Sequence, residues 1–329
     1  MTHPREVFGY EGGEGAEQAF AAALASGRLH HAWLLTGPEG IGKATFAYRA
    51  ARRLLGAAPD ASSGLLGSDP AHPVSRQVAA RSHPDLMVLE RETDDGKPRR
   101  NIPVDEARRL PEFFSKAPGS APFRVAIIDA ADDLNVNAAN AVLKTLEEPP
   151  ERGVLFLVSH APGRLLPTIR SRCRRLAFPA WSDERIAAFV VARGAAGPED
   201  AERLAQMAKG APGRALQLAA QDALGADKAV HEILRRLPEV DESMLLSLAD
   251  GFRGAEGAER FGLVIERLAD QVHDMAVGAA RAGETGGLER WAQAWERLSR
   301  LPDEVEAVNL DRTDAFFTAV GDLRQAASA

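Results

Sequence analysis

The sequence contains a glycine-rich segment of the kind that binds phosphate groups. Residues 37–45 read GPEGIGKAT and match the pattern G-x-x-x-x-G-K. The flexible backbone at Gly37, Gly40 and Gly42 lets N–H groups surround phosphate oxygens, and the start of the following helix adds a positive dipole end. Lys43 is expected to reach the outer phosphates. The segment therefore predicts a nucleotide site, with a glycine-rich turn that holds no ligand as the alternative.

Two groups that ATP hydrolysis requires are missing from their usual positions. The residue after the loop lysine normally supplies a hydroxyl to Mg²⁺, but here it is Ala44. Thr45 lies one residue further on, turned by about 100° around the helix, so it cannot take over that role without a shift. Asp129 ends the apolar segment RVAIID as an Mg²⁺-directing carboxylate would, but Ala130 follows it in place of a water-orienting Glu. The site is therefore expected to bind nucleotide and to hydrolyse it poorly or not at all.

Short apolar segments alternate with helical segments in the first half of the chain. Apolar runs that stop at Gly or at a polar residue predict buried strands, and amphipathic spacing predicts the helices between them. This alternation indicates a mainly parallel sheet with helices on both faces. The predicted strands are 31–36, 86–89, 124–129 and 154–159, and the predicted helices are 43–55, 104–114 and 137–146.

The strand signal disappears after Phe178 and Pro179, and only helical segments follow. Three short helices are predicted first, and every segment from about residue 240 onward has helical character. The three helices are 183–192, 199–209 and 215–220. The predicted domains are an α/β phosphate-loop domain over 1–178, a three-helix lid over 179–240, and a helical domain over 241–329.

The composition is that of a soluble globular protein. Of the 329 residues, 45% are hydrophobic and 26% are charged, which excludes a fibrous or wholly disordered chain. No apolar run approaches the ~18 residues of a membrane span, and the N-terminus shows no secretory signal. The single cysteine, Cys173, excludes an internal disulfide and a zinc site built on two or more thiolates. We therefore expect a protein of the reducing cytoplasm without a membrane span.

Charge is distributed unevenly along the chain, whose net charge is −7. Residues 241–329 hold 17 acidic and 9 basic residues, so the acidity lies in the last quarter. A protein that grips phosphodiester backbone usually has a basic face, but this sequence has only one local basic cluster. That cluster fits nucleic acid, a protein interface or a phosphate site, and direct DNA binding is not favoured. Its members are Arg164, Arg170, Arg172, Arg174 and Arg175.

Four motifs together resemble the bacterial clamp-loader subunits of DNA polymerase III, which are AAA+ proteins. Residues 139–150 read ANAVLKTLEEPP, and residues 168–173 read TIRSRC with the family's Ser-Arg-Cys triplet. His83-Pro84-Asp85 and residues 210–214 (GAPGR) add two landmarks in the same order. The resemblance covers about residues 20–220. It implies an AAA+ domain with a parallel sheet, a small helical lid and an all-helical collar domain for oligomerisation.

The same resemblance assigns roles to two arginines. Arg172 of the Ser-Arg-Cys triplet matches an arginine finger, whose guanidinium would enter the ATP site of a neighbouring motor subunit in trans. The alternative is that Arg172 belongs to a solvated basic patch. Arg214 matches a second nucleotide sensor in the lid, and a solvated arginine at a helix start is an equal alternative. The degenerate nucleotide site would then comprise Gly37, Gly40, Gly42, Lys43, Thr45, Asp129 and Arg214.

The polar residues beside these motifs have simpler interpretations. Asp132 and Asp133 are expected to be solvated or to cap a helix. Ser159 and His160 end a strand where the family places a phosphate sensor, although a loop histidine is the more frequent role. Cys173 is expected to be a packed side chain, because no His and Asp or Asn set accompanies it.

Many family members carry four zinc-binding cysteines in the segment that corresponds to residues 57–84. This sequence has none there, and His72 and His83 alone cannot form a structural zinc site. We therefore expect no zinc and a shortened or loose loop. ATP or ADP is the only cofactor implied, bound without hydrolysis.

The resemblance implies a non-hydrolysing stator subunit that lends Arg172 to a partner while the sliding clamp is loaded onto DNA. The implied partners are the gamma/tau motor subunits and the delta subunit, and through the complex the clamp and primer-template DNA. The chain alone would then lack ATPase activity while belonging to a DNA-directed DNA polymerase assembly. The alternatives are an active gamma/tau-like ATPase motor in which Thr45 serves the metal, a P-loop kinase or unrelated NTPase, and a direct DNA-binding module.

Overall fold

The computed structural model describes residues 2–91, 93–94, 97–98, 101–283 and 287–328. The chain divides into two compact units, 1–216 and 217–329. The predicted division into three domains stays a prediction. None of the described helices is long and apolar enough to cross a membrane.

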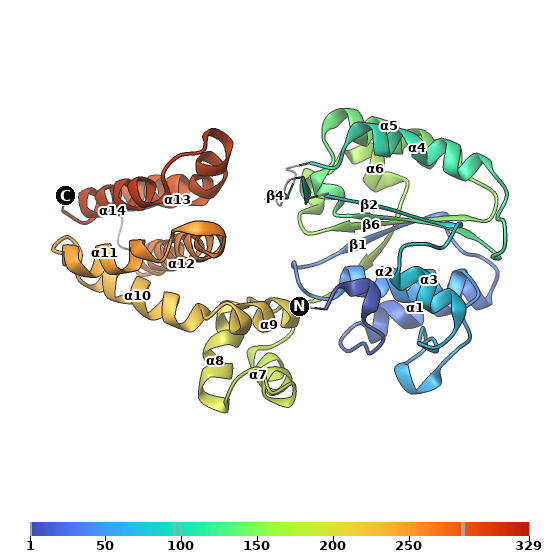
Figure 1. The fold of residues 1–329 in the computed structure, drawn as a ribbon, viewed down its shortest axis with the longest axis horizontal. Helices are drawn as coiled ribbons and strands as arrows, with labels where there is room; N and C mark the ends of the chain where they lie inside the picture. Colours follow the sequence, from blue (N-terminus) through green and yellow to red (C-terminus); the bar gives the residue numbers. More distant parts are fainter. Residues whose placement is uncertain (1, 92, 95–96, 99–100, 284–286, 329) are drawn as a thin grey trace. The chain divides into compact units, whose positions relative to one another are not determined.

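The first unit is built around a five-stranded parallel sheet in the order β2-β5-β6-β1-β7 (Figure 1). Strands β1 and β6 are buried along their whole length, because continuous apolar strands of a parallel sheet are covered on both faces. The predicted α/β fold class with a parallel sheet and following helices is confirmed. The strands are β1 (Ala32–Thr36), β2 (Leu86–Glu90), β5 (Arg124–Asp129), β6 (Gly153–Ser159) and β7 (Arg174–Ala177), with a small hairpin of β3 (Thr93–Asp94) and β4 (Lys97–Pro98) beside them.

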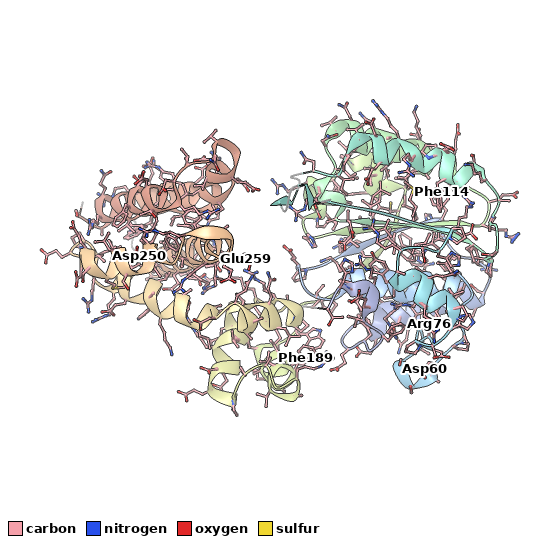
Figure 2. All side chains as sticks on the ribbon, viewed as in Figure 1. Asp60, Arg76, Phe114, Phe189, Asp250 and Glu259 are labelled. Carbon is pink, nitrogen blue, oxygen red and sulfur yellow. The ribbon has the colours of Figure 1, made fainter. Side chains whose placement is uncertain are left out.

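Helices cover both faces of this sheet. Figure 1 shows α1, α2 and α3 on one face, and α4, α5 and α6 on the other. The core on the second face includes Leu110, Phe114 (labelled in Figure 2) and Val142, which meet the inward side chains of β5 and β6. The helices are α1 (Glu14–Ala25), α2 (Lys43–Leu54), α3 (Pro73–Ala79), α4 (Val104–Ser115), α5 (Val136–Glu147) and α6 (Pro167–Ser171).

The strand register brings the loops of the candidate site to one edge. Thr36 at the end of β1 lies opposite Ser159 at the end of β6, and Glu90 of β2 lies opposite Asp129 of β5. Because parallel strands end on the same side of a sheet, the phosphate loop after β1 and the turns after β5 and β6 share that side.

The second unit consists of helices. A buried ion pair joins two of them, since Arg267 of α12 lies 2.9 Å from Asp227 of α10. Helix α10 was not among the three short helices predicted for residues 179–240, so the sequence-based description of that segment was incomplete. Helices α7 (Asp183–Ala192), α8 (Pro198–Met207) and the start of α9 (Pro212–Ala220) belong to the first unit. The second unit continues with α10 (Ala223–Arg235), α11 (Glu242–Asp250), α12 (Gly254–Arg281), α13 (Leu288–Val308) and α14 (Arg312–Ser328).

Residues 57–84 are ordered by local contacts, so the expectation of a loose loop was wrong, while that of a shortened one stays a prediction. Pro59 and Ser68 form a β-bridge, and Asp60 caps a short 3₁₀ helix (Ala61–Ser63) through the Ser62 N–H. Asp60 and Arg76 mark this segment in Figure 2. Buried Leu66 and Val78 tie it to the core, so local capping and apolar contacts hold it without cysteines.

Candidate nucleotide site and arginine finger

The phosphate loop connects β1 to α2. Gly37, Gly40 and Gly42 have φ angles of 152°, 76° and 102°, which side chains rarely adopt, so the three glycines are required by the backbone path. Gly42 is the N-cap of α2 and makes no side-chain cap bond. No side chain of Gly42 therefore bonds to the first N–H groups of α2. A phosphate-binding loop needs these N–H groups to be available for phosphate oxygens.

Lys43 is turned into its own loop. Its Nζ donates to the carbonyl oxygens of Gly37 and Pro38, both at 2.6 Å, and the residue is only 2% exposed. Burial lowers the pKa of the ammonium to about 8, although the nearby carboxylates of Asp129 and Glu39 act in the opposite direction. To reach a phosphate, this ammonium must exchange the two carbonyl bonds for phosphate oxygens.

The start of α9 lies against the phosphate loop. The Gly213 N–H donates to the Gly40 carbonyl at 2.9 Å, and a Cβ added to Gly40 would lie 2.7 Å from the Arg214 backbone nitrogen. The structure therefore brings Arg214 next to the loop, as the sequence analysis placed it, while its role as a sensor stays a prediction. A side chain on Gly40 or Gly213 would separate these two segments.

Because of this contact, a methyl group added at Gly213 is expected to destabilise the fold. A Cβ on Gly213 would lie 2.6 Å from the Gly40 carbonyl oxygen. We expect Gly213→Ala to lower the free energy of unfolding by about 1–3 kcal/mol, since backbone on both sides must move. Denaturant titration followed by circular dichroism measures this. Gly15→Ala in α1, where nothing lies within 4 Å of the added Cβ, is the matched control and should be neutral or stabilising. Equal behaviour of the two variants would contradict the contact.

A segment near the N-terminus covers the other side of the loop, which the sequence analysis did not foresee. A Cβ on Gly42 would lie 3.1 Å from the Tyr10 ring, and the Arg49 guanidinium stacks on that ring at 5.3 Å. Arg49 also forms a buried ion pair with Glu17 at 2.9 Å. Arg49 of α2 therefore helps to hold the segment 8–17 beside the phosphate loop.

Asp129 and Thr45 are two further residues of the predicted nucleotide site. Burial, reinforced by Glu90, raises the pKa of the Asp129 carboxyl to about 6 against the opposing charge of Lys43. Thr45 lies half-buried in the first turn of α2. Asp129 thus lies near enough to Lys43 for their charges to interact, while metal binding by Asp129 or Thr45 stays a prediction.

Asp132 is half-buried and bonds to the turn after β6, so the expectation of a solvated or helix-capping carboxylate was wrong. Its carboxylate accepts hydrogen bonds from the Ser159 Oγ at 3.0 Å, from the His160 N–H at 2.7 Å and from the Ala161 N–H at 3.2 Å. Asp132 therefore fixes the turn after β6 at the edge where the phosphate loop lies. Asp133 instead pairs with Arg91 at 3.1 Å.

Arg172 lies on the other side of the sheet from the phosphate loop's helix. It follows α6, which packs with α5, whereas Lys43 begins α2 on the opposite face (Figure 1). The Arg172 Nη1 donates to the Thr168 carbonyl at 3.1 Å, and its Nη2 lies 3.1 Å from Glu147 Oε1. The side chain is 37% exposed, so its guanidinium is accessible to another molecule.

Two other arginines of the basic cluster, Arg174 and Arg175, contact residues of the sheet. Arg174 stacks on the buried Trp33 ring at 4.9 Å, and the Arg175 Nε donates to the Thr36 hydroxyl at 2.9 Å. Both lie on β7, an edge strand, where long charged side chains discourage further strand pairing. Burial raises the pKa of the Cys173 thiol to about 12, which keeps it protonated and agrees with a packed side chain.

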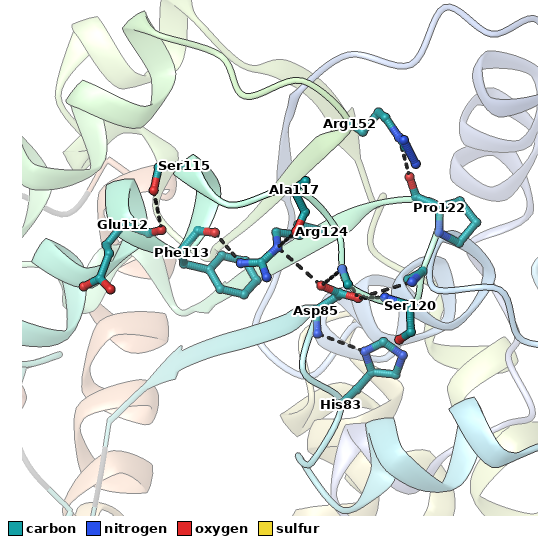
Figure 3. Close-up of polar contacts among 12 residues, drawn as sticks. His83, Asp85, Glu112, Phe113, Ser115, Ala117, Ser120, Pro122, Arg124 and Arg152 are labelled. Atoms are coloured by element: carbon teal, nitrogen blue, oxygen red, sulfur yellow. Dashed lines mark hydrogen bonds and ion pairs between the residues drawn. The ribbon is translucent and has the colours of Figure 1, made fainter.

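The His83-Pro84-Asp85 landmark forms a structural network (Figure 3). The buried Asp85 carboxylate accepts the N–H groups of Gly119, Ser120 and Ala121 and lies 3.3 Å from the Arg124 Nε. Burial alone would raise the pKa of Asp85, but these donors outweigh it and hold the pKa below its ordinary value. The His83 ring accepts the Asp85 N–H, and His72 caps α3. Across the described ranges, no three His, Cys, Asp or Glu side chains are grouped so that they could hold a metal ion.

A parallel sheet with a phosphate loop after β1 and an aspartate at the end of β5 is the architecture of P-loop nucleotide-binding proteins. The sequence profile of the family described as DNA polymerase III, delta subunit, matches residues 12–182, more than half of the chain. The chain belongs to that family, and the resemblance to clamp-loader subunits is confirmed.

Individual relatives agree with this family. The DNA polymerase III subunit delta′ of Pseudomonas aeruginosa is 44% identical over 164 residues, which are 50% of this chain and 48% of that protein. The gamma subunit of Buchnera aphidicola is 34% identical over 174 residues, 52% of this chain and 45% of that protein. The chain thus spans about half the length of the curated relatives it matches. A gamma subunit-related protein of Thermotoga maritima aligns with a TM-score of 0.44 and 17% identity, covering 96% of this chain and 99% of that one.

Proposed function

We propose that this chain is a clamp-loader subunit of delta-prime type that does not hydrolyse ATP and supplies Arg172 to the ATP site of a neighbouring motor subunit. The observation that carries the proposal is the place of Arg172, exposed directly after α6 and paired with Glu147 of α5, two helices that lie on the opposite sheet face from α2 of its own phosphate loop. An arginine in that place serves a site on another chain better than its own. The partners would be gamma/tau motor subunits and a delta subunit, and through them the sliding clamp and primer-template DNA.

The chemistry of the loop supports the absence of hydrolysis. Backbone N–H groups at the start of α2 and the Lys43 ammonium are donors that fit phosphate oxygens. The metal side is incomplete, because Ala44 offers no hydroxyl and Ala130 offers no carboxylate to orient water. ATP or ADP would be held by Gly37, Gly40, Gly42 and Lys43, with Thr45, Asp129 and Arg214 around them, and would remain intact.

Hydrolysis by the purified chain tests this part of the proposal. We expect ATP turnover with Mg²⁺ to stay at the level of a Lys43→Ala variant, because both lack a complete metal and water site. Phosphate release at several protein concentrations is the measurement. Turnover that rises with the chain's concentration and disappears in Lys43→Ala would overturn the proposal. It would favour the motor alternative, which the likeness to the Buchnera gamma subunit keeps open.

A further inference from the structure

The side chain of Glu147 contacts the guanidinium of Arg172. Glu147 is the last residue of α5, and Arg172 follows the last residue of α6. The Glu147 Oε1 lies 3.1 Å from the Arg172 Nη2, and the Thr168 carbonyl accepts from the Nη1 at 3.1 Å. The guanidinium is therefore held at two of its nitrogens, from two different helices.

We propose that Glu147 is a positioning residue for Arg172, and this rests on the function proposed above for that arginine. A guanidinium is planar and presents five N–H groups, so two contacts fix both its place and its plane. The N–H groups that remain are free to meet phosphate oxygens of a partner's nucleotide. Glu147 itself would not touch the nucleotide, because its carboxylate repels phosphate and acts only through the arginine.

The geometry points to a role in orientation more than in stability. Glu147 is 54% exposed, and exposed ion pairs contribute little to folding. The neighbouring Glu148 is also exposed but forms no ion pair within the described part of the chain. The chain thus offers two adjacent carboxylates, of which one holds the arginine and the other serves as a matched control.

The experiment uses this chain assembled with its motor and delta subunits, with DNA and clamp present. We expect Glu147→Ala to lower the kcat for ATP about two- to fivefold, which is the population change that an exposed ion pair produces. The KM for ATP should stay unchanged, since the partner still binds nucleotide. Glu147→Gln should restore most of the rate, because its amide oxygen can still accept from the guanidinium. Glu148→Ala should leave kcat unchanged.

The same substitution in an Arg172→Ala background separates positioning from a structural role. If Glu147 acts through the arginine, Glu147→Ala causes no further loss there, so the two effects are not additive. A further loss in that background, an equal loss from Glu148→Ala, or a faster rate of the single variant would overturn the inference. If Arg172→Ala lowers kcat but Glu147→Ala does not, only the positioning role fails. If Arg172→Ala has no effect, the proposed function itself fails.

Discussion

Replacing Arg172 by Ala should slow ATP hydrolysis at the motor site next to this chain by about 10³-fold, because an arginine finger supplied in trans has effects of that order. The substitution removes the side chain beyond Cβ, whose guanidinium is exposed and forms an ion pair with the exposed Glu147. The fold and the assembly of the complex should therefore be preserved. Single-turnover hydrolysis in the reconstituted complex, with nucleotide binding measured separately, is the appropriate measurement.

The control for this substitution is Arg170→Ala. Arg170 is exposed on the short helix α6, two residues before Arg172, so the two variants remove equal charge from one neighbourhood of the surface. If Arg172 acted only as part of a basic patch, both variants would weaken DNA-dependent turnover similarly and the loss would shrink at high salt. A finger predicts a loss for Arg172→Ala alone, at every salt concentration at which the complex stays assembled. Arg172→Lys should not restore the rate, since an ammonium lacks the planar fork of donors.

Strands and helices that are marked by a pattern of neighbouring residues could be predicted from the sequence. Strand β5 was predicted with the bounds that the structure has, because its apolar run is bordered by Arg124 and Asp129. Helix α2 was predicted to within one residue, since the glycines before it and its apolar spacing both mark it. Strand β7 was missed because Arg174 and Arg175 look like surface residues. An edge strand such as β7, paired with β1, tolerates such residues, and no apolar run marks it in the sequence.

The sequence motifs of the candidate site could be predicted, but the contacts between distant segments could not. Residues 37–45 indicate a phosphate loop by themselves, whereas the hydrogen bond between Gly40 and Gly213 joins residues far apart in the chain. Asp132 was misjudged for the same reason, since its three donors come from the turn after the next strand. No spacing rule links such positions, because only the fold decides which loops meet.

The second large effect is expected at Asp227, in the helical unit. Its carboxylate accepts from the Arg267 Nε at 3.2 Å, from the Arg267 Nη2 at 2.9 Å and from the Gln271 Nε2 at 2.9 Å. Asp227 and Arg267 are both buried, so Asp227→Ala leaves a buried cation that has lost its buried partner and keeps its ion pair with Asp270. We expect the free energy of unfolding to fall by about 3–5 kcal/mol, as when one partner of a buried pair is removed. Denaturant titration followed by circular dichroism measures the loss.

Two further variants distinguish this ion pair from a general effect of removing charge. Asp274→Ala, also on α12 but 72% exposed, should change the free energy of unfolding by less than about 1 kcal/mol. Replacing both partners, with Asp227→Leu and Arg267→Met, should restore much of the lost stability, since no charge is then left buried without its partner. If the double variant were as unstable as Asp227→Ala, the cost would come from packing rather than from a buried cation that has lost Asp227. If Asp227→Ala were as stable as Asp274→Ala, the pair would not hold α10 on α12.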